Sequence, residues 1–580
     1  MGTPAPLYSA LRGWRRTRPE AAAYTHLRPD GHGNSTLETL TWEQLDLRVA
    51  ILARRLTVVC DRQDRVVLAL PQTLYYPVAF FACLRAALVA VPVSTVESPG
   101  HEIRLRSVIA DCDPAVVLTT EEHLDAVRGL VGRLSCDLDR ARAPRVIAVD
   151  DSRDPEERPV PAEDIGAEDV AYLQYTSGST STPAGVVVTH SALHKNLDQI
   201  VERFAPDAGC TSVSWLPFFH DMGLLNGLLV PVRVGCRAVF MEPTAFIGQP
   251  GAWIGALARF PRAYSAAPSF AFELIMRRMQ PADLEGIDLS GLHGVVVGSE
   301  PINGAVMGLV EAELGRVGLR PDALMPSYGL AENVVLVSGD RGVRTYTLDA
   351  DALRRDRAER APGEPGSVTL VGCGRPVNGL SLRIVDPRKR VPCPPGRVGE
   401  VWCHDPDAPH RYWSSAGRQD DTFDGRLECG GDAPRSRWLR TGDLGVLVDG
   451  ELVITGRIKD LIIIDGVNHY PSDIERTATD IHPAVRAGRL VAFSVPVPGR
   501  GDSVSGEEIA LVVETRTDRE APEDLASQIR HEVTRVHNVP VHEVRLVRAG
   551  TLPLSTSGKV RRQATRALYL AGRLDEDGAQ

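Results

Sequence analysis

Apolar residues recur along the N-terminal part of the chain at two alternating spacings. A capping-box pattern at Thr41-Trp-Glu-Gln44 precedes apolar residues at the spacing of one helix face: Leu45, Val49, Leu52 and Leu56. Short β-branched runs then alternate with helical stretches, and they predict strands at Arg65–Leu70, Val89–Val93, Ala115–Thr119 and Arg145–Val149. Because strands that alternate with helices usually pair in parallel, this pattern predicts a parallel sheet covered by helices.

The alternation continues beyond residue 190. A helix is predicted from Leu193, Leu197, Ile200 and Phe204, and strands are predicted at Ser212–Leu216, Ala238–Met241, Ala263–Ala267, Val295–Val297 and Leu324–Tyr328. Short strands and turns from Gly379 to Val448 predict a small β-rich unit. The last part has an α+β pattern, with strands at Leu461–Ile464, Leu490–Val495 and Ile509–Glu514 and helices at Pro471–Asp480 and Glu523–Val536.

The predicted fold class is therefore α/β, with two domains of unequal size. Residues 1–456 form a large N-terminal domain of helix-covered sheets together with the β-rich subdomain. Gly456-Arg-Ile-Lys-Asp460 joins it to a small α+β C-terminal domain, residues 461–580.

One charged stretch interrupts the periodic pattern. Asp340 to Gly366 contains a short helical candidate, Asp351 to Arg360, and ends in Pro-Gly-Glu-Pro-Gly. Composition alone leaves two interpretations open, a solvated surface insert and an element that docks on the rest of the protein.

Composition narrows the class of protein. The chain has 580 residues, 43% hydrophobic residues and a formal net charge of -10, which indicates a soluble globular protein and argues against nucleic acid as a partner. The most apolar span, Val66 to Val96, is interrupted by prolines and an arginine, so no membrane span is predicted. Ten cysteines without a Cys-x-x-Cys pair indicate a reduced, cytoplasmic protein.

The segment richest in hydroxyls and glycines lies between two apolar runs. Val170 to Tyr175 and Val186 to Thr189 predict two strands, with the loop Thr176 to Gly185 between them. Glycines let a backbone wrap around an anion, while hydroxyls and amides donate hydrogen bonds to it. The loop is not a Walker loop, because Ala184 precedes Gly185 and no Gly-Lys-Ser/Thr follows. The candidate phosphate-binding residues are Thr176, Ser177, Gly178, Ser179 and Thr180.

Two further turns follow predicted strands, where open α/β sheets bind their ligands. They are Gly298-Ser-Glu-Pro301 and Ser327-Tyr-Gly-Leu-Ala-Glu332. Arg440-Thr-Gly-Asp-Leu444 places a carboxylate at a glycine turn, where it can accept hydrogen bonds from two hydroxyls. His220, in Trp215–Gly223, has two interpretations: a residue beside a substrate, or part of a helix-start turn capped by Asp221.

These segments, in this order, resemble the motifs of the adenylate-forming (AMP-binding) enzymes, and the resemblance covers nearly the whole chain. Most of that family has Gly where this chain has Ser181, Lys where it has Ala184, and many members have Thr where it has Ala331. These departures resemble the fatty acyl-AMP ligase branch of actinobacterial type. Members of that branch carry an insertion that hinders reaction with CoA, and Arg344 to Gly372 matches it in place and character.

The resemblance implies a role for each matching residue. Lys559, in the C-terminal Thr-Ser-Gly-Lys-Val560 loop, would be catalytic, and His220 would border the acyl pocket. Glu332 would hold Mg²⁺, with Thr176 as a second metal contact. Residues 457–460 would be a hinge that contains Lys459. The remaining ATP- and AMP-binding residues would be Ser177, Gly178, Ser179, Thr180, Gly298, Ser299, Glu300, Pro301, Ser327, Tyr328, Gly329, Asp443 and Arg457.

The implied reaction has two steps and two cofactors, ATP and Mg²⁺. A fatty acid carboxylate would attack the α-phosphorus of ATP, and a thiol would then attack the resulting acyl-adenylate. In the fatty acyl-AMP ligases the thiol is the phosphopantetheine arm of an acyl carrier protein. An acyl- or aryl-CoA ligase is the alternative, and a non-catalytic nucleotide-binding protein of the same fold is a further one.

Overall fold

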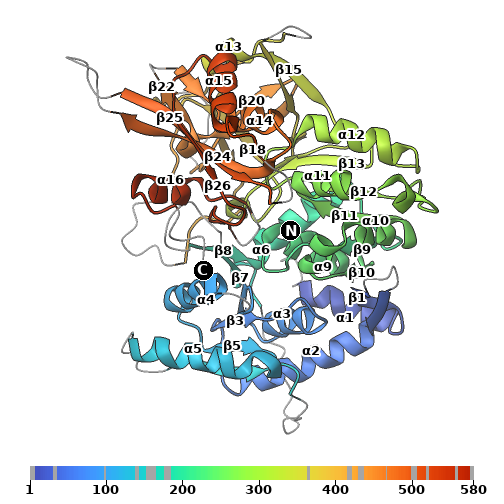
Figure 1. Ribbon diagram of the computed structural model, residues 1–580. Helices are drawn as coiled ribbons and strands as arrows, with labels where there is room; N and C mark the ends of the chain where they lie inside the picture. Colours follow the sequence, from blue (N-terminus) through green and yellow to red (C-terminus); the bar gives the residue numbers. More distant parts are fainter. Residues whose placement is uncertain are drawn as a thin grey trace. The chain divides into compact units, whose positions relative to one another are not determined.

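A computed structural model describes residues 7–30, 35–96, 99–137, 143–151, 165–175, 184–361, 366–413, 421–428, 437–464, 467–497, 506–517, 521–555 and 559–574 (Figure 1). The chain divides into two compact units, each described here by itself. Unit 1 comprises residues 1–344, 373–381 and 404–424, and unit 2 comprises residues 345–372, 382–403 and 425–580. No helix within the described ranges is both long and apolar enough to cross a membrane.

Unit 1 is built on two large sheets. The nine-stranded sheet has the order β17 (Arg375–Pro376), β14 (Ser338–Gly339), β13 (Leu324–Tyr328), β12 (Gly294–Val297), β11 (Ala263–Ala267), β9 (Thr211–Ser214), β10 (Arg237–Phe240), β1 (Ala22–Pro29) and β2 (Ser35–Thr41). The six-stranded sheet has the order β6 (Arg145–Ala148), β5 (Val116–Thr119), β3 (Arg65–Ala69), β4 (Val89–Val93), β7 (Val170–Tyr175) and β8 (Gly185–Thr189).

Helices connect and cover these strands (Figure 1). They are α1 (Leu7–Thr17), α2 (Trp42–Thr57), α3 (Tyr75–Arg85), α4 (Pro99–Cys112), η1 (Glu121–His123), α5 (Leu124–Asp137), α6 (His190–Phe204), α7 (Asp221–Gly223), η2 (Leu224–Leu229), α8 (Val230–Val234), α9 (Pro243–Gly248), α10 (Pro250–Arg259), α11 (Ser269–Arg278), η3 (Pro281–Leu284), α12 (Gly304–Gly315) and η4 (Ala331–Asn333). The capping box predicted for α2 is confirmed, because Thr41 and Gln44 exchange side-chain and backbone hydrogen bonds.

The parallel pairing predicted for the strands of both sheets is confirmed for the inner strands, and the sheet edges add antiparallel pairs. The inner strands pair in parallel, but β7–β8, β1–β2 and β13–β14 are antiparallel. In β7–β8 the connection is short, and a parallel pair needs a crossover of a dozen or more residues. Strand β8 therefore extends the six-stranded sheet at its edge, next to β7.

Unit 2 contains smaller sheets and five short helical segments among its described residues. Two sheets have two strands each: β15 (Thr345–Asp349) pairs with β16 (Ser367–Val371), and β22 (Ile462–Ile464) pairs with β23 (Val467–His469). A four-stranded sheet has the order β18 (Ser381–Val385), β19 (Gly399–His404), β20 (Leu439–Val448) and β21 (Glu451–Arg457). A three-stranded sheet has the order β24 (Val485–Val497), β25 (Gly506–Thr515) and β26 (Val541–Val547). The helices are α13 (Ala350–Arg354), η5 (Ile458–Asp460), α14 (Pro471–Asp480), α15 (Leu525–His537) and α16 (Arg562–Leu570).

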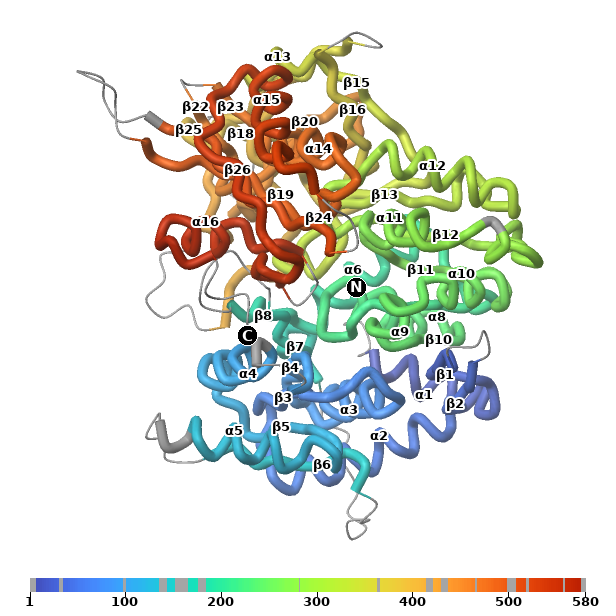
Figure 2. The backbone as a smooth tube through the Cα atoms, viewed as in Figure 1, coloured from blue at the N-terminus to red at the C-terminus, as the bar shows by residue number. Residues whose placement is uncertain are grey.

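The charged insertion folds as a docked hairpin rather than a solvated loop (Figure 2). Its helix α13 is shorter than the predicted Asp351–Arg360 and is capped by Asp349. Leu348, Leu353 and Val368 are buried in one cluster that also contains Val453 of β21. These residues are apolar within an otherwise charged stretch, and their burial explains why the segment docks.

Candidate active site

Two of the predicted nucleotide-binding turns leave neighbouring parallel strands of unit 1. Strand β12 precedes Gly298, strand β13 carries Ser327, and Val297 pairs with Pro326 across the ladder. The Ser327 hydroxyl donates to the carbonyl oxygen of Val297 over 3.2 Å. A Cβ at Gly298 would lie 2.8 Å from Ser327 Oγ, so only glycine allows the two turns to approach this closely.

The rest of the first turn is tied to neighbouring helices. Ser299 has a φ of 67°, and its hydroxyl lies 3.1 Å from Met222 Sδ. Glu300 Oε1 accepts a hydrogen bond of 2.7 Å from the backbone N–H of Phe270, at the start of α11. This half-buried carboxylate ties the turn to the start of α11, so Glu300 has a structural function in the fold.

A small cavity of ≈ 30 Å³ lies where these turns meet α6, α7 and η2. Ser299, Ser327, Tyr328 and Gly329 contribute to its lining, together with Ile200, Phe204, Asp221, Met222, Asn226, Val296, Val335 and Leu336. A volume of this size holds only a water or two. The cavity is therefore too small for a nucleobase or an acyl chain unless the lining side chains move.

His220 lies immediately before α7, beside that lining. Its Nδ1 is 2.7 Å from Asp221 Oδ1, and the same carboxylate oxygen accepts from the Met222 N–H. The helix-start interpretation therefore describes the local geometry. A contact between His220 and a substrate stays a prediction.

Glu332 lies in η4, and one side chain outside the sequence-based candidates contacts it. The Tyr412 hydroxyl donates a hydrogen bond of 2.7 Å to Glu332 Oε1. Tyr412 also pairs with Val186 of β8, the strand that follows the hydroxyl-rich loop. Sequence reasoning missed Tyr412 because it lies 80 residues after Glu332. Its only local signal is an aromatic pair, Tyr412-Trp413, in a polar stretch.

The strands on either side of the hydroxyl-rich loop are fixed firmly. Tyr175 pairs with Gly185, and a Cβ at Gly185 would lie 2.8 Å from the Tyr175 ring. The Tyr175 hydroxyl donates to Asp111 over 2.5 Å, and burial, followed by nearby Cys112 and Asp111, raises the pKa of Tyr175. Thr176, Ser177, Gly178, Ser179 and Thr180 themselves lie outside the described residues.

In unit 2, the structure brings Asp443 and Arg457 together. The two residues face each other on β20 and β21, and Arg457 Nε donates to Asp443 Oδ1 over 2.6 Å. Asp443 is buried, whereas the Arg457 side chain is 58% exposed. An exposed arginine that orients a buried carboxylate is suited to a ligand with both hydroxyl and anionic groups.

Lys559 lies in unit 2 and is hydrogen-bonded to Ser555. The Ser555 N–H donates to the Lys559 carbonyl oxygen over 2.7 Å, and the Lys559 N–H donates to Ser555 Oγ over 3.1 Å. Leu554 and Val560 form a bridge just outside this pair. The backbone of Lys559 itself is thus held by Ser555, while residues 556–558 lie outside the described residues.

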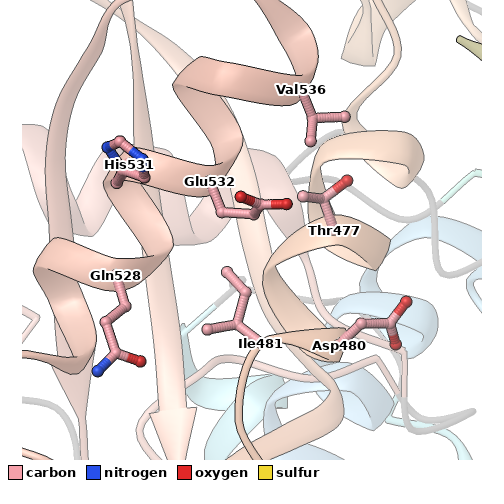
Figure 3. A pocket seen from close by; sticks show the side chains of 7 residues that line it. All are labelled: Thr477, Asp480, Ile481, Gln528, His531, Glu532 and Val536. Carbon is pink, nitrogen blue, oxygen red and sulfur yellow. The ribbon is translucent and has the colours of Figure 1, made fainter. Parts of the chain in front are cut away.

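A wide groove in unit 2, of ≈ 580 Å³, contains none of these residues (Figure 3). It lies between α14 and α15 and is lined by Thr477, Asp480, Ile481, Gln528, His531, Glu532 and Val536. Size alone therefore does not identify the reaction site. The candidate site residues of the preceding paragraphs lie at strand ends and turns instead.

Comparisons with known proteins identify the family to which the chain is similar. The family model described as AMP-binding enzyme matches residues 11–413, and a model described as Disco-interacting protein 2-like, AMP domain, matches residues 459–578. A relative named long-chain-fatty-acid–AMP ligase, from Mycobacterium marinum, is 39% identical over 97% of this chain and 96% of its own length.

Solved structures with the same fold include fatty acyl-adenylate ligases. One, from work on these ligases of E. coli and L. pneumophila, has a TM-score of 0.84 and 30% identity, with 98% of each chain covered. Another, the L. pneumophila ligase with acyl adenylate and pyrophosphate, has a TM-score of 0.72 and 30% identity, with 97% of this chain and 96% of that chain covered.

Proposed function

The chain belongs to the AMP-binding enzyme family, and on that premise we propose that it activates a fatty acid with ATP and passes the acyl group to the phosphopantetheine thiol of an acyl carrier protein. One observation carries the first half of this proposal. The turns after β12 and β13 meet at the carboxyl ends of parallel strands, and Glu332, on the second turn, is oriented by Tyr412.

The first step joins the fatty acid to the nucleotide. A carboxylate oxygen attacks the α-phosphorus of ATP, the bond from that phosphorus to the bridging oxygen breaks, and pyrophosphate leaves. The attacking and attacked groups are both anionic, so the site must supply positive charge and hydrogen-bond donors. Lys559 and the Thr176–Thr180 loop are the proposed donors, and Asp443 is the proposed acceptor for the ribose hydroxyls.

Glu332 fits the proposed role of a Mg²⁺ ligand. Magnesium is usually held in such sites by one or two carboxylates together with substrate phosphates. The Tyr412 hydroxyl is a neutral donor to Glu332, so it orients the carboxylate and stabilises its charged form. When bound, Mg²⁺ would reduce the negative charge of the phosphates during the attack.

The second step transfers the acyl group. A thiol sulfur attacks the carbonyl carbon of the acyl-adenylate, the carbon–oxygen bond to AMP breaks, and the thiol proton is released. The proposed hinge at residues 457–460 would let the C-terminal domain, residues 461–580, rearrange between the two steps.

The insertion supports a carrier-protein acceptor rather than CoA. Its hairpin packs against β21, before the proposed hinge, and its cluster also includes Tyr470, after the hinge. Asn468 Nδ2 donates to Asp356 Oδ1 over 2.8 Å, which adds a polar contact beyond the hinge. An element that contacts both sides of a hinge restricts the rotations that are possible, and we propose that it disfavours the pose needed for attack by CoA. An acyl- or aryl-CoA ligase is the alternative.

The compartment proposed for this chemistry is the cytoplasm. Cys83, Cys210, Cys236 and Cys393 are free thiols, and free thiols are usual in a reducing compartment.

Pyrophosphate release tests the adenylation step. Purified protein is mixed with ATP, Mg²⁺ and a panel of fatty acids of different length, and each acid is also tested without ATP. We expect pyrophosphate and an acyl-adenylate that depend on both substrates. A protein that binds ATP but releases no pyrophosphate with any acid would instead be the non-catalytic alternative.

A further inference from the structure

Arg562, the first residue of α16, is held by two carboxylates from separate parts of unit 2. Its side chain is 19% exposed. One guanidinium nitrogen, Nη1, donates to Glu475 of α14 and, over 2.8 Å, to the carbonyl oxygen of Ala492. Nη2 donates to the other Glu475 oxygen over 3.3 Å. Nε lies 3.8 Å from Asp460 Oδ2, in the proposed hinge turn η5.

A second contact joins the same two elements. Gln563 Nε2 donates over 3.0 Å to the carbonyl oxygen of Lys459, the proposed hinge residue. The first two residues of α16 therefore both contact η5. Neither contact is local, because about a hundred residues separate the partners in sequence.

The helix itself gives no reason for an arginine at this place. A cation in the first turn of a helix is disfavoured by the helix dipole. The two carboxylates compensate for this. Burial alone would lower the pKa of Arg562, but Glu475 and Asp460 raise it by more, so the pKa lies above its ordinary value. The charge at Arg562 thus serves contacts outside its own helix.

Arg562 is also only three residues after Lys559. The residues between them are fixed, because Val560 bridges Leu554 and the Arg561 N–H donates to the Pro553 carbonyl oxygen over 2.9 Å. A continuous series of contacts thus runs from η5 through Arg562 to the backbone at Lys559.

We propose that Arg562 is a positioning residue that connects the hinge turn η5 rigidly to the backbone at Lys559. Rotation at the hinge would then move η5 and Lys559 together. The inference rests on the proposed functions of Lys459 and Lys559. Arg562 contacts neither nucleotide nor acid in this account. Its effect reaches the reaction only through the placement of Lys559, which the adenylation step needs and the thiol transfer does not.

Two variants separate this function from general stability. Arg562→Gln removes both carboxylate contacts, whereas Asp460→Asn weakens only the hinge contact and keeps the Glu475 pair. Arg566→Gln is the matched control, since Arg566 lies on the same helix and donates to the Ser494 carbonyl oxygen over 2.9 Å. Arg562→Lys tests whether a retained charge restores part of the activity.

The kinetic readout compares the two half-reactions of each variant. We expect Arg562→Gln to lower the turnover number for pyrophosphate release on the order of ten- to a hundredfold, as small misplacements of a catalytic group do. Asp460→Asn should lower the same turnover number several-fold. The KM for ATP should stay nearly unchanged in both Arg562→Gln and Asp460→Asn. Transfer from supplied acyl-AMP to free phosphopantetheine should change little. Equal losses in both half-reactions, or no loss in either, would overturn the inference.

Amide hydrogen exchange gives a readout that needs no activity. In Arg562→Gln and Asp460→Asn the hydrogen-bonded N–H groups of Ser555, Lys559 and Arg561 should exchange faster, and in Arg566→Gln they should not. Unchanged exchange in both test variants would overturn the inference. If the wild type releases no pyrophosphate, the proposed function is refuted. If exchange in Arg562→Gln and Asp460→Asn is still faster, the contact of Arg562 with the backbone at Lys559 remains supported.

Discussion

Tyr412 donates a hydrogen bond of 2.7 Å to Oε1 of Glu332. The contact joins the turn after β13 to a segment that pairs with β8. It therefore connects the proposed metal ligand with the strand that follows the proposed phosphate loop. Tyr412 thus contacts Glu332 through its hydroxyl and Val186 through its backbone.

Tyr412→Phe should weaken the response to Mg²⁺. The variant removes the donor but keeps the ring, which packs edge-on against Phe423 with 5.0 Å between centroids. The Mg²⁺ concentration for half-maximal pyrophosphate release should rise about fivefold, since one such hydrogen bond contributes roughly 1 kcal/mol. Tyr75→Phe, on α3, is the control. An unchanged Mg²⁺ dependence would show that Tyr412 does not orient Glu332 for metal binding.

Lys559→Ala should nearly abolish acyl-AMP formation while ATP binding is retained. The backbone around Lys559 is fixed by Ser555, so the substitution should remove a charge without unfolding the turn. Removing one donor of this kind costs on the order of a hundredfold in rate. Pyrophosphate release and calorimetric ATP titration measure the two quantities separately. Release at the wild-type rate would remove Lys559 from the mechanism.

Asp443→Ala should weaken nucleotide binding. The buried carboxylate is the proposed acceptor for the ribose hydroxyls, and its loss also leaves Arg457 without this partner. We expect the affinity for ATP and AMP to fall roughly tenfold, as for the loss of hydrogen bonds to a charged group.

Glu532→Ala is the control for Asp443→Ala, because it removes another carboxylate paired with an arginine, Arg535, in the groove of Figure 3. Equal affinities of folded wild type and Asp443→Ala would exclude Asp443 from the nucleotide site.

Shortening the insertion should change the acceptor and spare the adenylation step. Replacing residues 345–372 by a short Gly/Ser linker removes the hairpin, and Asn468→Ala removes only its polar contact with Asp356. Acyl-AMP formation should persist, and acyl-CoA should rise from a low starting level, most in the shortened protein. Melting curves check folding. Abundant acyl-CoA from the intact protein would favour the CoA-ligase alternative.

The sequence was most informative where local chemistry determines the structure. The capping box of α2 and strands such as β4, β11 and β13 match their predicted residues. Cap residues and the valines of β4 act over short distances in the sequence.

Long-range contacts could not be predicted in the same way. The Tyr412–Glu332 hydrogen bond, the docking of the insertion and the contacts of Arg562 all join residues far apart in sequence. No local pattern encodes such a pair. The two strands β7 and β8 were predicted from their apolar runs, but their antiparallel pairing is a contact between strands that the runs alone do not specify.

Oxygen-isotope tracing tests the central claim most directly. A fatty acid labelled with oxygen-18 in both carboxyl oxygens is turned over with ATP and a carrier thiol, and the AMP is analysed by mass spectrometry. Attack of the carboxylate on the α-phosphorus, followed by thiol attack on the carbonyl carbon, leaves one labelled oxygen in AMP. We predict singly labelled AMP with unlabelled pyrophosphate. Unlabelled AMP, or formation of ADP and phosphate in place of AMP and pyrophosphate, would contradict adenylate formation.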